Sequence, residues 1–362
     1  MSKGGGEDGI RVHLWSSVFL PGSAWGGMSA LDQASVVYRW DLDKTYLLSE
    51  FESLREMMRI PFERPEDKVA APGVAALIRG LRTAALGRGR GVRVYFLSAS
   101  PPQIGRAIRR KLELDGILYD GIVFKDQLQR IFRGKFRHLR EQVGYKLTEL
   151  LKARHAEPIG AREFLFGDDW ESDPMIYSLY ADVVAGRIAP AALGELLQAA
   201  RVDKSLIEEA RQLAAELPKT DAVARIFINL ERPTPPVALR PYGGRLVPSF
   251  NYLQTAACLY AEGVLGAVGV CDVARALIEE SGFTPPRLAN SLADVVRRGH
   301  LPASRGDEVR RSLAAAGLLA PPPRRWHLST GRRRGAAARV PAPGLVAEDY
   351  RALVGAQEGA AE

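Results

Sequence analysis

Two aspartates stand two positions apart at the end of an apolar run, in the segment VVYRWDLDKT of residues 36–45. The β-branched and aromatic residues before them are typical of a strand, so Asp41 and Asp43 are expected where the chain leaves a sheet. Carboxylates this close repel one another unless a cation or a shared proton relieves the repulsion. Oxygen ligands favour Mg²⁺ over zinc. The spacing predicts a magnesium site, with a solvated acidic turn as the competing interpretation.

Further polar residues end the later apolar runs. Ser98 follows directly on the run of residues 92–97, and Ser100 is the alternative hydroxyl at that strand end. Asp168 and Asp169 follow the short run FLFG. The carboxyl ends of parallel strands share one edge of a sheet, and ligands of open α/β sheets bind at that edge. If these runs are parallel strands, their polar ends meet in one crevice.

A lysine near these strand ends would complete a cluster of charged groups, and three candidates precede the run that ends at Asp168. Lys146 opens the helical pattern KLTELLKARH, and its distance from Gly167 leaves room for one helix and a short loop. Lys135 and Lys125 are the alternatives. On this geometry we assign the lysine to Lys146.

The runs that carry these residues alternate with helical patterns. Expected strands cover residues 36–40, 92–97, about 117–124, 163–166 and 223–230, and expected helices cover residues 47–60, 72–86, 103–114, a stretch from 146 and one from 174. Alternation of this kind predicts an α/β fold in which helices cover both faces of a parallel sheet.

Composition sets the class of protein. A chain of 362 residues with 46% hydrophobic residues can bury a full α/β core. The net charge of +8 is uneven, because six arginines fall between Arg324 and Arg339 without one Asp or Glu. The two cysteines, Cys258 and Cys271, exclude a disulfide framework and a cysteine-rich metal site, so we expect a reducing compartment.

The segments that could direct the chain to a membrane are weak. The N-terminal residues make a poor signal peptide, because acidic residues precede a short mixed stretch. The apolar window of residues 253–270 is interrupted by Gln254 and Glu262, which favours a buried helix over a membrane span. We therefore expect a cytoplasmic protein.

The ordered strand-end residues resemble the four motifs of the haloacid dehalogenase (HAD) superfamily. The matching segments are DLDKT at residues 41–45, FLS ending at Ser98, the lysine Lys146, and GDDWESD at residues 167–173. YFLSASP and FLFGDDWESDPMIY further resemble the catalytic domain of the actin-patch type of phosphatidate phosphatases. The resemblance covers residues 36–230 and implies a HAD-like, Rossmannoid three-layer fold with phosphatase activity.

The resemblance also implies roles for the acidic residues. Asp41 would attack phosphorus and form an aspartyl-phosphate, which divides one difficult displacement into two easier ones. Asp43 would protonate the leaving oxygen and then deprotonate the attacking water. Mg²⁺ would bind the carboxylates of Asp41 and Asp168 and the backbone carbonyl of Asp43.

The other motif residues are expected to bind or support. Ser98 and Lys146 would hold the phosphoryl oxygens as their charge shifts in the transition state. Thr45 is expected to hold the loop or Asp43 in place. Asp169 and Asp173 are expected to act as supports, through water or by hydrogen bonding to Lys146.

Five segments follow from these patterns: an N-terminal extension (1–34), the catalytic domain (35–240) with a helical insertion (190–217), a helical module (241–320) and a basic tail (321–362). The insertion should lie far from the catalytic edge, because the helix after the fourth strand returns to the opposite edge. The module either covers the crevice as a lid or packs on the flank of the sheet. The tail, rich in Pro, Gly and Arg, is expected to be disordered.

Function classes stay open at this level. A Mg²⁺-dependent phosphomonoesterase acting on phosphatidate or a related lipid phosphate is the favoured hypothesis, and a soluble sugar, nucleotide or protein phosphate is the alternative. In a different class, the chain is an inactive HAD-like module whose basic tail binds membrane or nucleic acid. We expect peripheral contact between that tail and anionic lipid, and no specific nucleic acid partner.

Overall fold

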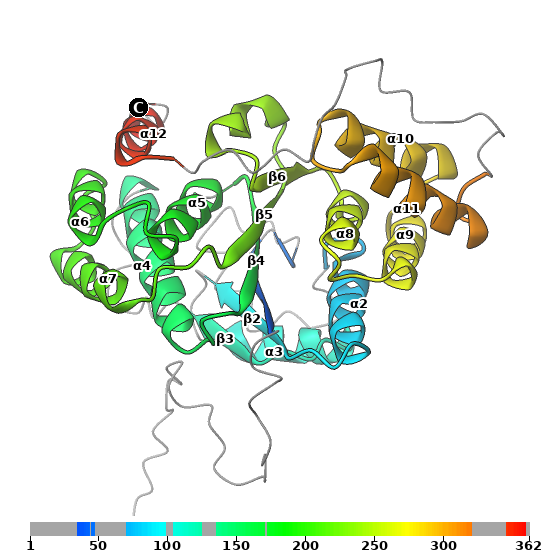
Figure 1. The fold of residues 1–362 in the computed structure, drawn as a ribbon, viewed down its shortest axis with the longest axis horizontal. Coiled ribbons are helices and arrows are strands. Elements are labelled where there is room, and N and C mark those ends of the chain that lie inside the picture. Colours follow the sequence, from blue (N-terminus) through cyan, green and yellow to red (C-terminus); the bar gives the residue numbers. More distant parts are fainter. Residues whose placement is uncertain are drawn as a thin grey trace, which may run out of the picture.

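Six parallel strands form the centre of the protein. The structure is a computed structural model that describes residues 35–43, 45–47, 70–98, 104–124, 135–170, 172–320 and 345–359, with backbone only at 135–142 and 354–359. The strands are β1 (Val36–Asp41), β2 (Val92–Ser98), β3 (Gly121–Phe124), β4 (Arg162–Asp168), β5 (Val223–Asn229) and β6 (Leu246–Ser249). Their spatial order is β3-β2-β1-β4-β5-β6 (Figure 1). The expected parallel sheet is therefore confirmed.

The register of the sheet brings the polar strand ends together. Asp41 pairs with Leu97 of β2, one residue before Ser98, and Asp168 ends the neighbouring strand β4. The central strand β1 thus has the serine strand on one side and the aspartate strand on the other. Sequence patterns did not predict β6, and β3 begins later than expected.

Helices cover both faces of the sheet (Figure 1). One face carries α2 (Val74–Leu86), α3 (Gly105–Leu114), α8 (Tyr252–Ala261), α9 (Ala267–Ser281), α10 (Pro285–Arg297) and α11 (Ala303–Ala315), which share a single hydrophobic core. The other face carries α4 (Lys135–His155), α5 (Asp173–Val184), α6 (Pro190–Ala199), α7 (Lys204–Glu216) and α12 (Ala347–Gly359) around a second core. A three-layer α/β architecture results.

Successive side chains of β1 alternate between the two layers, as a strand requires. Trp40 points into the first core, where its ring stacks on Phe166 of β4 with centroids 3.7 Å apart. Arg39 and Asp41 point toward the second layer. There Lys146 of α4 contacts Asp41, and Arg39 bonds to Glu163 of β4, which also accepts from Arg154 of α4. One face of β1 is thus apolar, and the opposite face carries charge.

Several helix predictions need correction. The helix expected to begin at Lys146 begins at Lys135, because the basic stretch before it continues into the same 21-residue helix. The tail was expected to be disordered to its end, but residues 347–359 form α12, whose buried Tyr350 donates a hydrogen bond to Asp182 of α5 at 2.6 Å. The N-terminal extension, most of the helix expected at 47–60 and the arginine-rich stretch of the tail lie outside the described residues.

The added helices bury their apolar sides within the two layers. The insertion forms α6, which contributes Leu193, Leu196 and Leu197 to the second core, and α7, which contributes Ala210 and Ala214. In the helical module, α9 lies along α2 and closes the first core over the sheet. The apolar surface of the module is therefore buried against one flank of the sheet.

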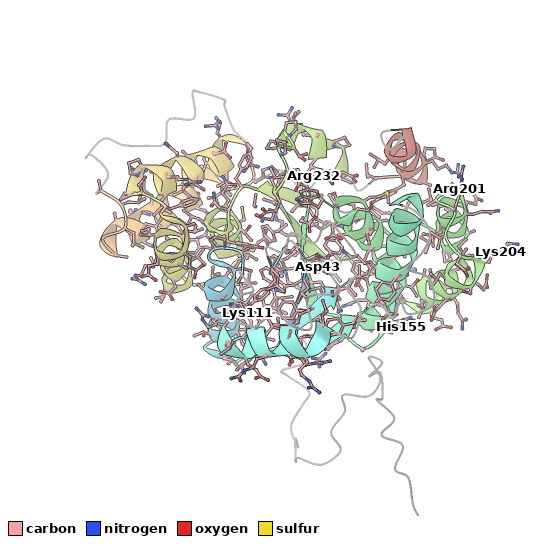
Figure 2. All side chains as sticks on the ribbon, turned by 180° about the vertical axis from the view of Figure 1, so that it is seen from behind. Asp43, Lys111, His155, Arg201, Lys204 and Arg232 are labelled. Atoms are coloured by element: carbon pink, nitrogen blue, oxygen red, sulfur yellow. The ribbon has the colours of Figure 1, made fainter. Side chains whose placement is uncertain are left out.

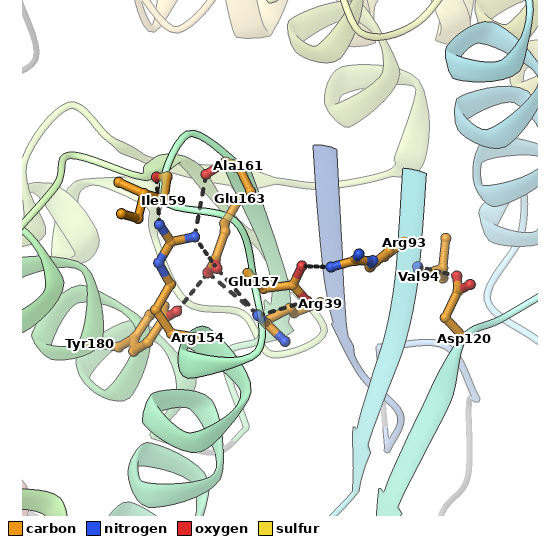
Figure 3. A network of polar contacts seen from close by, with 10 residues as sticks. All are labelled: Arg39, Arg93, Val94, Asp120, Arg154, Glu157, Ile159, Ala161, Glu163 and Tyr180. Carbon is orange, nitrogen blue, oxygen red and sulfur yellow. Dashed lines mark hydrogen bonds and ion pairs between the residues drawn. The ribbon is translucent and has the colours of Figure 1, made fainter. Parts of the chain in front are cut away.

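A buried network of ion pairs lies on the charged side of β1, around Arg39 (Figure 3). We call it the Glu163 network: Arg39, Arg154, Glu157, Glu163 and Tyr180. Glu163 accepts hydrogen bonds from Arg39 at 3.2 Å, from Arg154 at 3.2 Å and from the Tyr180 hydroxyl at 2.6 Å. Burial alone would raise the pKa of Glu163, but the two guanidinium groups and the hydroxyl outweigh it, so this pKa is lowered.

Candidate active site

Asp41 ends β1 with its side chain fully buried. The strand places it there because Val37, Arg39 and Asp41 share one face, and the next residue, Leu42, still bonds to the carbonyl of Leu97. The carboxylate therefore lies at the end of a hydrogen-bonded strand and faces α4 and α5. A nucleophile needs a fixed position of this kind.

Lys146 connects Asp41 to the start of α5. Its ammonium lies 2.7 Å from Oδ1 of Asp41 and 2.7 Å from Oδ1 of Asp173, and all three side chains are fully buried. Lys146 lies in the interior of α4, so its approach is fixed by the packing of a long helix. Asp173 is the first residue of α5, and Pro174 follows it at a position that favours helix initiation.

Asp168 adds a third buried carboxylate from the end of β4. Its Oδ1 accepts a hydrogen bond from the backbone N–H of Trp170 at 2.6 Å, and its Oδ2 lies 3.5 Å from the hydroxyl of Thr45. The loop after β1, which carries Thr45, is therefore linked to the loop after β4 across the neighbouring strand ends.

These residues fit a divalent cation. Asp41, Asp168 and Asp173 each offer one carboxylate oxygen, and the three oxygens lie within 4.8 Å of one another. We call these three residues, together with Lys146, the Asp cluster. The ammonium of Lys146 offsets one of the three carboxylate charges, and burying the others without compensation is unfavourable. Hard oxygen donors with excess negative charge suit Mg²⁺.

Asp43 and Ser98 form a separate pair beside the Asp cluster. The hydroxyl of Ser98 donates to Oδ2 of Asp43 at 2.9 Å, across the boundary between β1 and β2. Ser98 is buried, whereas Asp43 is partly exposed. Asp43 therefore has the access that a proton-transfer group needs, and the serine fixes one of its oxygens.

A glycine allows α5 to approach β4. A Cβ atom on Gly167 would lie 2.4 Å from Oδ2 of Asp173 and 2.8 Å from the ring of Tyr177. Any larger residue would push the first turn of α5 away from the strand. Gly167 is therefore what lets Asp173 reach Lys146, and sequence analysis assigned it no such role.

Asp169 differs from the support expected of it. Its Oδ1 accepts from the backbone N–H groups of Glu231 and Arg232, at 2.8 Å and 3.1 Å. The residue therefore joins the loop after β4 to the loop after β5, and among the described residues it makes no hydrogen bond to Lys146. In Figure 2, Asp43 and Arg232 both lie in the middle of the molecule, between the two helical layers.

Tyr252 is a neighbour of the site that sequence analysis missed. Its hydroxyl, at the start of α8, donates to the backbone carbonyl of Thr45 at 2.6 Å. Burial, with added repulsion from Glu231, Asp168 and Asp41, raises the pKa of this phenol well above its ordinary value, so it stays a neutral donor. The role of Tyr252 becomes visible only in the structure, where its hydroxyl is buried. The periodicity of the sequence does not indicate it.

Not every predicted residue can be placed. The structure brings together Asp41, Asp43, Thr45, Ser98, Lys146, Asp168 and Asp173. Ser100 and Lys125 lie outside the described residues, and only the backbone of Lys135 is described.

Comparison of the chain with protein-family models, with curated proteins and with solved structures gave no match in any of the three. Among the helices described by the structure, none has the length and apolar character to cross a membrane. The site must therefore be interpreted from its own geometry.

Proposed function

We propose that the protein is a Mg²⁺-dependent phosphomonoesterase of the haloacid dehalogenase type. The observation that carries the proposal is the Asp cluster, in which buried carboxylates from β1, β4 and α5 lie close together at the carboxyl edge of a parallel sheet and two of them pair with one ammonium. The motif resemblance of residues 36–230 supports the same chemistry and a HAD-like form of the fold.

In the first step, Asp41 attacks the phosphorus atom of a phosphomonoester. A bond forms between its carboxylate oxygen and phosphorus, and the bond between phosphorus and the leaving oxygen breaks. Asp43, partly exposed and held by Ser98, gives its proton to that leaving oxygen. Lys146 orients the attacking carboxylate through the contact at 2.7 Å.

In the second step, water attacks the phosphorus of the aspartyl-phosphate. Asp43 takes the proton from the water, inorganic phosphate leaves, and the Asp41 carboxylate is regenerated. Asp41, Asp168 and Asp173 would hold Mg²⁺, which supplies positive charge beside the phosphoryl oxygens when bound. Lys146 and Ser98 stabilise negative charge at the same strand ends.

For the substrate, we propose two classes of phosphomonoester. The segment GDDWESDPMIY favours phosphatidate or a related lipid phosphate by resemblance. A soluble sugar, nucleotide or protein phosphate is the second candidate, because the Asp cluster recognises the phosphoryl group and not the remainder of the substrate.

The test is hydrolysis of para-nitrophenyl phosphate by the full chain, with Mg²⁺ and with a chelator. We expect turnover that requires Mg²⁺ and that Asp41→Asn abolishes. Equal turnover in the chelator, or Mg²⁺-dependent turnover that survives in the variant, would refute the assignment. If the chain hydrolyses no phosphomonoester, aryl or lipid, the proposal of an inactive binding module takes its place.

A further inference from the structure

Trp170 and Arg232 form a stacked pair beside the Asp cluster. The guanidinium of Arg232 lies 4.2 Å from the centroid of the Trp170 ring, and the indole is 38% exposed. The backbone N–H of Trp170 donates to Asp168, a member of the Asp cluster, at 2.6 Å. The stacked pair is therefore linked to the Asp cluster through the backbone of Trp170.

The two halves of the pair come from different loops, and Asp169 holds these loops together. Its Oδ1 accepts from the backbone N–H of Arg232 at 3.1 Å and from that of Glu231 at 2.8 Å. Both loops follow strands at the carboxyl edge of the sheet. The backbone of Arg232 is consequently held in position, and the stack on Trp170 orients its guanidinium.

Arg232 differs in its charge environment from two of the other stacked arginines. Arg298 and Arg162 stack on rings but also pair with Asp294 and Glu262, respectively. Within the described part of the chain, Arg232 is exposed and has no carboxylate in ion-pair distance, and the adjacent Glu231 accepts instead from Asn229. A guanidinium that lies flat on an indole presents its N–H groups edge-on, in a fork that matches an oxyanion.

We propose that Arg232, held against Trp170, binds a second anionic group on the leaving portion of the substrate. This inference rests on the proposed phosphatase function. It favours phosphomonoesters that carry a carboxylate or a further phosphate near the scissile group over phosphatidate, which carries neither. Trp170 contributes the flat surface that keeps the guanidinium oriented, and Asp169 is a positioning residue for both loops.

The test compares substrates that differ in one group: phenyl phosphate, and phenyl phosphates with a carboxylate or a second phosphate in the meta or para position. We expect the wild-type kcat/KM to be about tenfold higher for at least one of the substrates that carry the added anionic group than for phenyl phosphate, mainly through a lower KM. Arg232→Met should reduce this ratio to about one, and Arg232→Lys should restore only part of it. Comparison of the carboxylate and phosphate series tells which oxyanion is recognised.

Arg287→Met is the matched control. Arg287, on α10, is also exposed, and its guanidinium lies 4.0 Å from the centroid of the Phe283 ring. This variant should leave the substrate ratio unchanged. A wild-type ratio of one, or a ratio that Arg232→Met does not alter, would overturn the inference and leave the pair a structural contact.

A binding measurement separates this inference from the proposed function. Titration calorimetry with benzylphosphonate and with para-carboxybenzylphosphonate requires no turnover. Tighter binding of the carboxylated ligand that is lost in Arg232→Met would support the anion site even if no ester were hydrolysed. Equal binding of both ligands, with normal hydrolysis of phenyl phosphate, would refute the inference while the phosphatase assignment stood.

Discussion

The Asp cluster and the Glu163 network lie on the same face of β1, two residues apart, and handle buried charge in opposite ways. In the Glu163 network, Arg39 and Arg154 surround Glu163, and Arg39 also lies 3.7 Å from Glu157. The Asp cluster contains three carboxylates and one ammonium, which pairs with Asp41 and Asp173. The first set is balanced by its own residues, whereas the second has an excess of negative charge.

We interpret the balanced Glu163 network as structural and the Asp cluster, with its excess negative charge, as a candidate site for chemistry. A buried carboxylate with matched arginines is fully satisfied, and such a network specifies how β1, β4 and α4 fit together. Carboxylates left with excess charge at a strand edge gain from a divalent cation and from a substrate brought beside it. The same strand thus carries Arg39, which belongs to a balanced network, and Asp41, which is the nucleophile under the proposed function.

The largest expected effect is on catalysis. Asp41→Asn keeps the volume of the side chain but removes the nucleophile, so kcat for para-nitrophenyl phosphate should fall by at least about 10²–10⁴. The variant should be at least as stable as wild type in a chelator, because one of three mutually repelling carboxylates is gone. Steady-state kinetics and thermal unfolding check the two parts. Near-normal turnover would show that another residue is the nucleophile.

Asp168→Asn tests the cation side of the same cluster. We expect a raised Mg²⁺ requirement with partial recovery of turnover at high Mg²⁺, which Asp41→Asn should not show. Mg²⁺ should also raise the melting temperature of wild type more than that of Asp168→Asn, since a ligand that binds the folded state stabilises it. Identical Mg²⁺ titrations for wild type and variant would remove Asp168 from the metal site.

Glu163→Gln should act on stability instead. Removing the carboxylate leaves Arg154 without this ion pair and Arg39 with only the longer contact to Glu157, so the free energy of unfolding should fall by about 3–5 kcal/mol. The Mg²⁺ requirement of the folded fraction should not change. Denaturant unfolding and Mg²⁺ titration measure these two effects separately.

The pH dependence of unfolding sharpens this prediction. Since the pKa of Glu163 is lower in the folded state than its ordinary value of 4.5, the folded protein binds fewer protons there than the unfolded chain. Its stabilising contribution is complete above that value and is lost as the pH falls below it. The loss should be smaller in Glu163→Gln. Glu262→Gln, which affects two partly exposed ion pairs, with Arg162 and with Arg225, is the control and should cost about 1 kcal/mol or less.

The smallest expected effect comes from Tyr252→Phe. This change removes the hydrogen bond to the carbonyl of Thr45 and should lower the free energy of unfolding by about 1 kcal/mol. Because Thr45 lies beside Asp168, kcat should fall modestly while the Mg²⁺ requirement stays the same. Unaltered stability and kinetics would show that the contact does not support the loop after β1.

Local patterns predicted the strands that carry the site well, because apolar runs ending in Asp41, Ser98 and Asp168 have the period and composition of buried strands. They failed at β6, where Pro248 lies in a short edge strand that reads as a turn. They also failed at the start of α4, since basic residues gave no apolar stripe to mark its first turns.

Contacts across the fold were harder to predict than elements. The link between Asp169 and the loop after β5, and that between Tyr252 and Thr45, join segments far apart in the sequence. Such contacts depend on how the loops pack against one another, and the local periodicity of the sequence does not predict loop packing. The place of Asp173 depends equally on the missing side chain of Gly167, which is visible only when α5 lies on β4.

The packing of α2 against α9 also bears on how the chain is synthesised. Helix α2 ends at Leu86 and contacts β2, but α9, the helix that lies along it, ends at Ser281. Part of its apolar side therefore stays uncovered until most of the described chain has been synthesised. Long-range closure of this kind slows folding and exposes hydrophobic surface to aggregation. Expression of residues 35–240 alone would leave α2 uncovered, so recombinant production should extend to residue 320 at least.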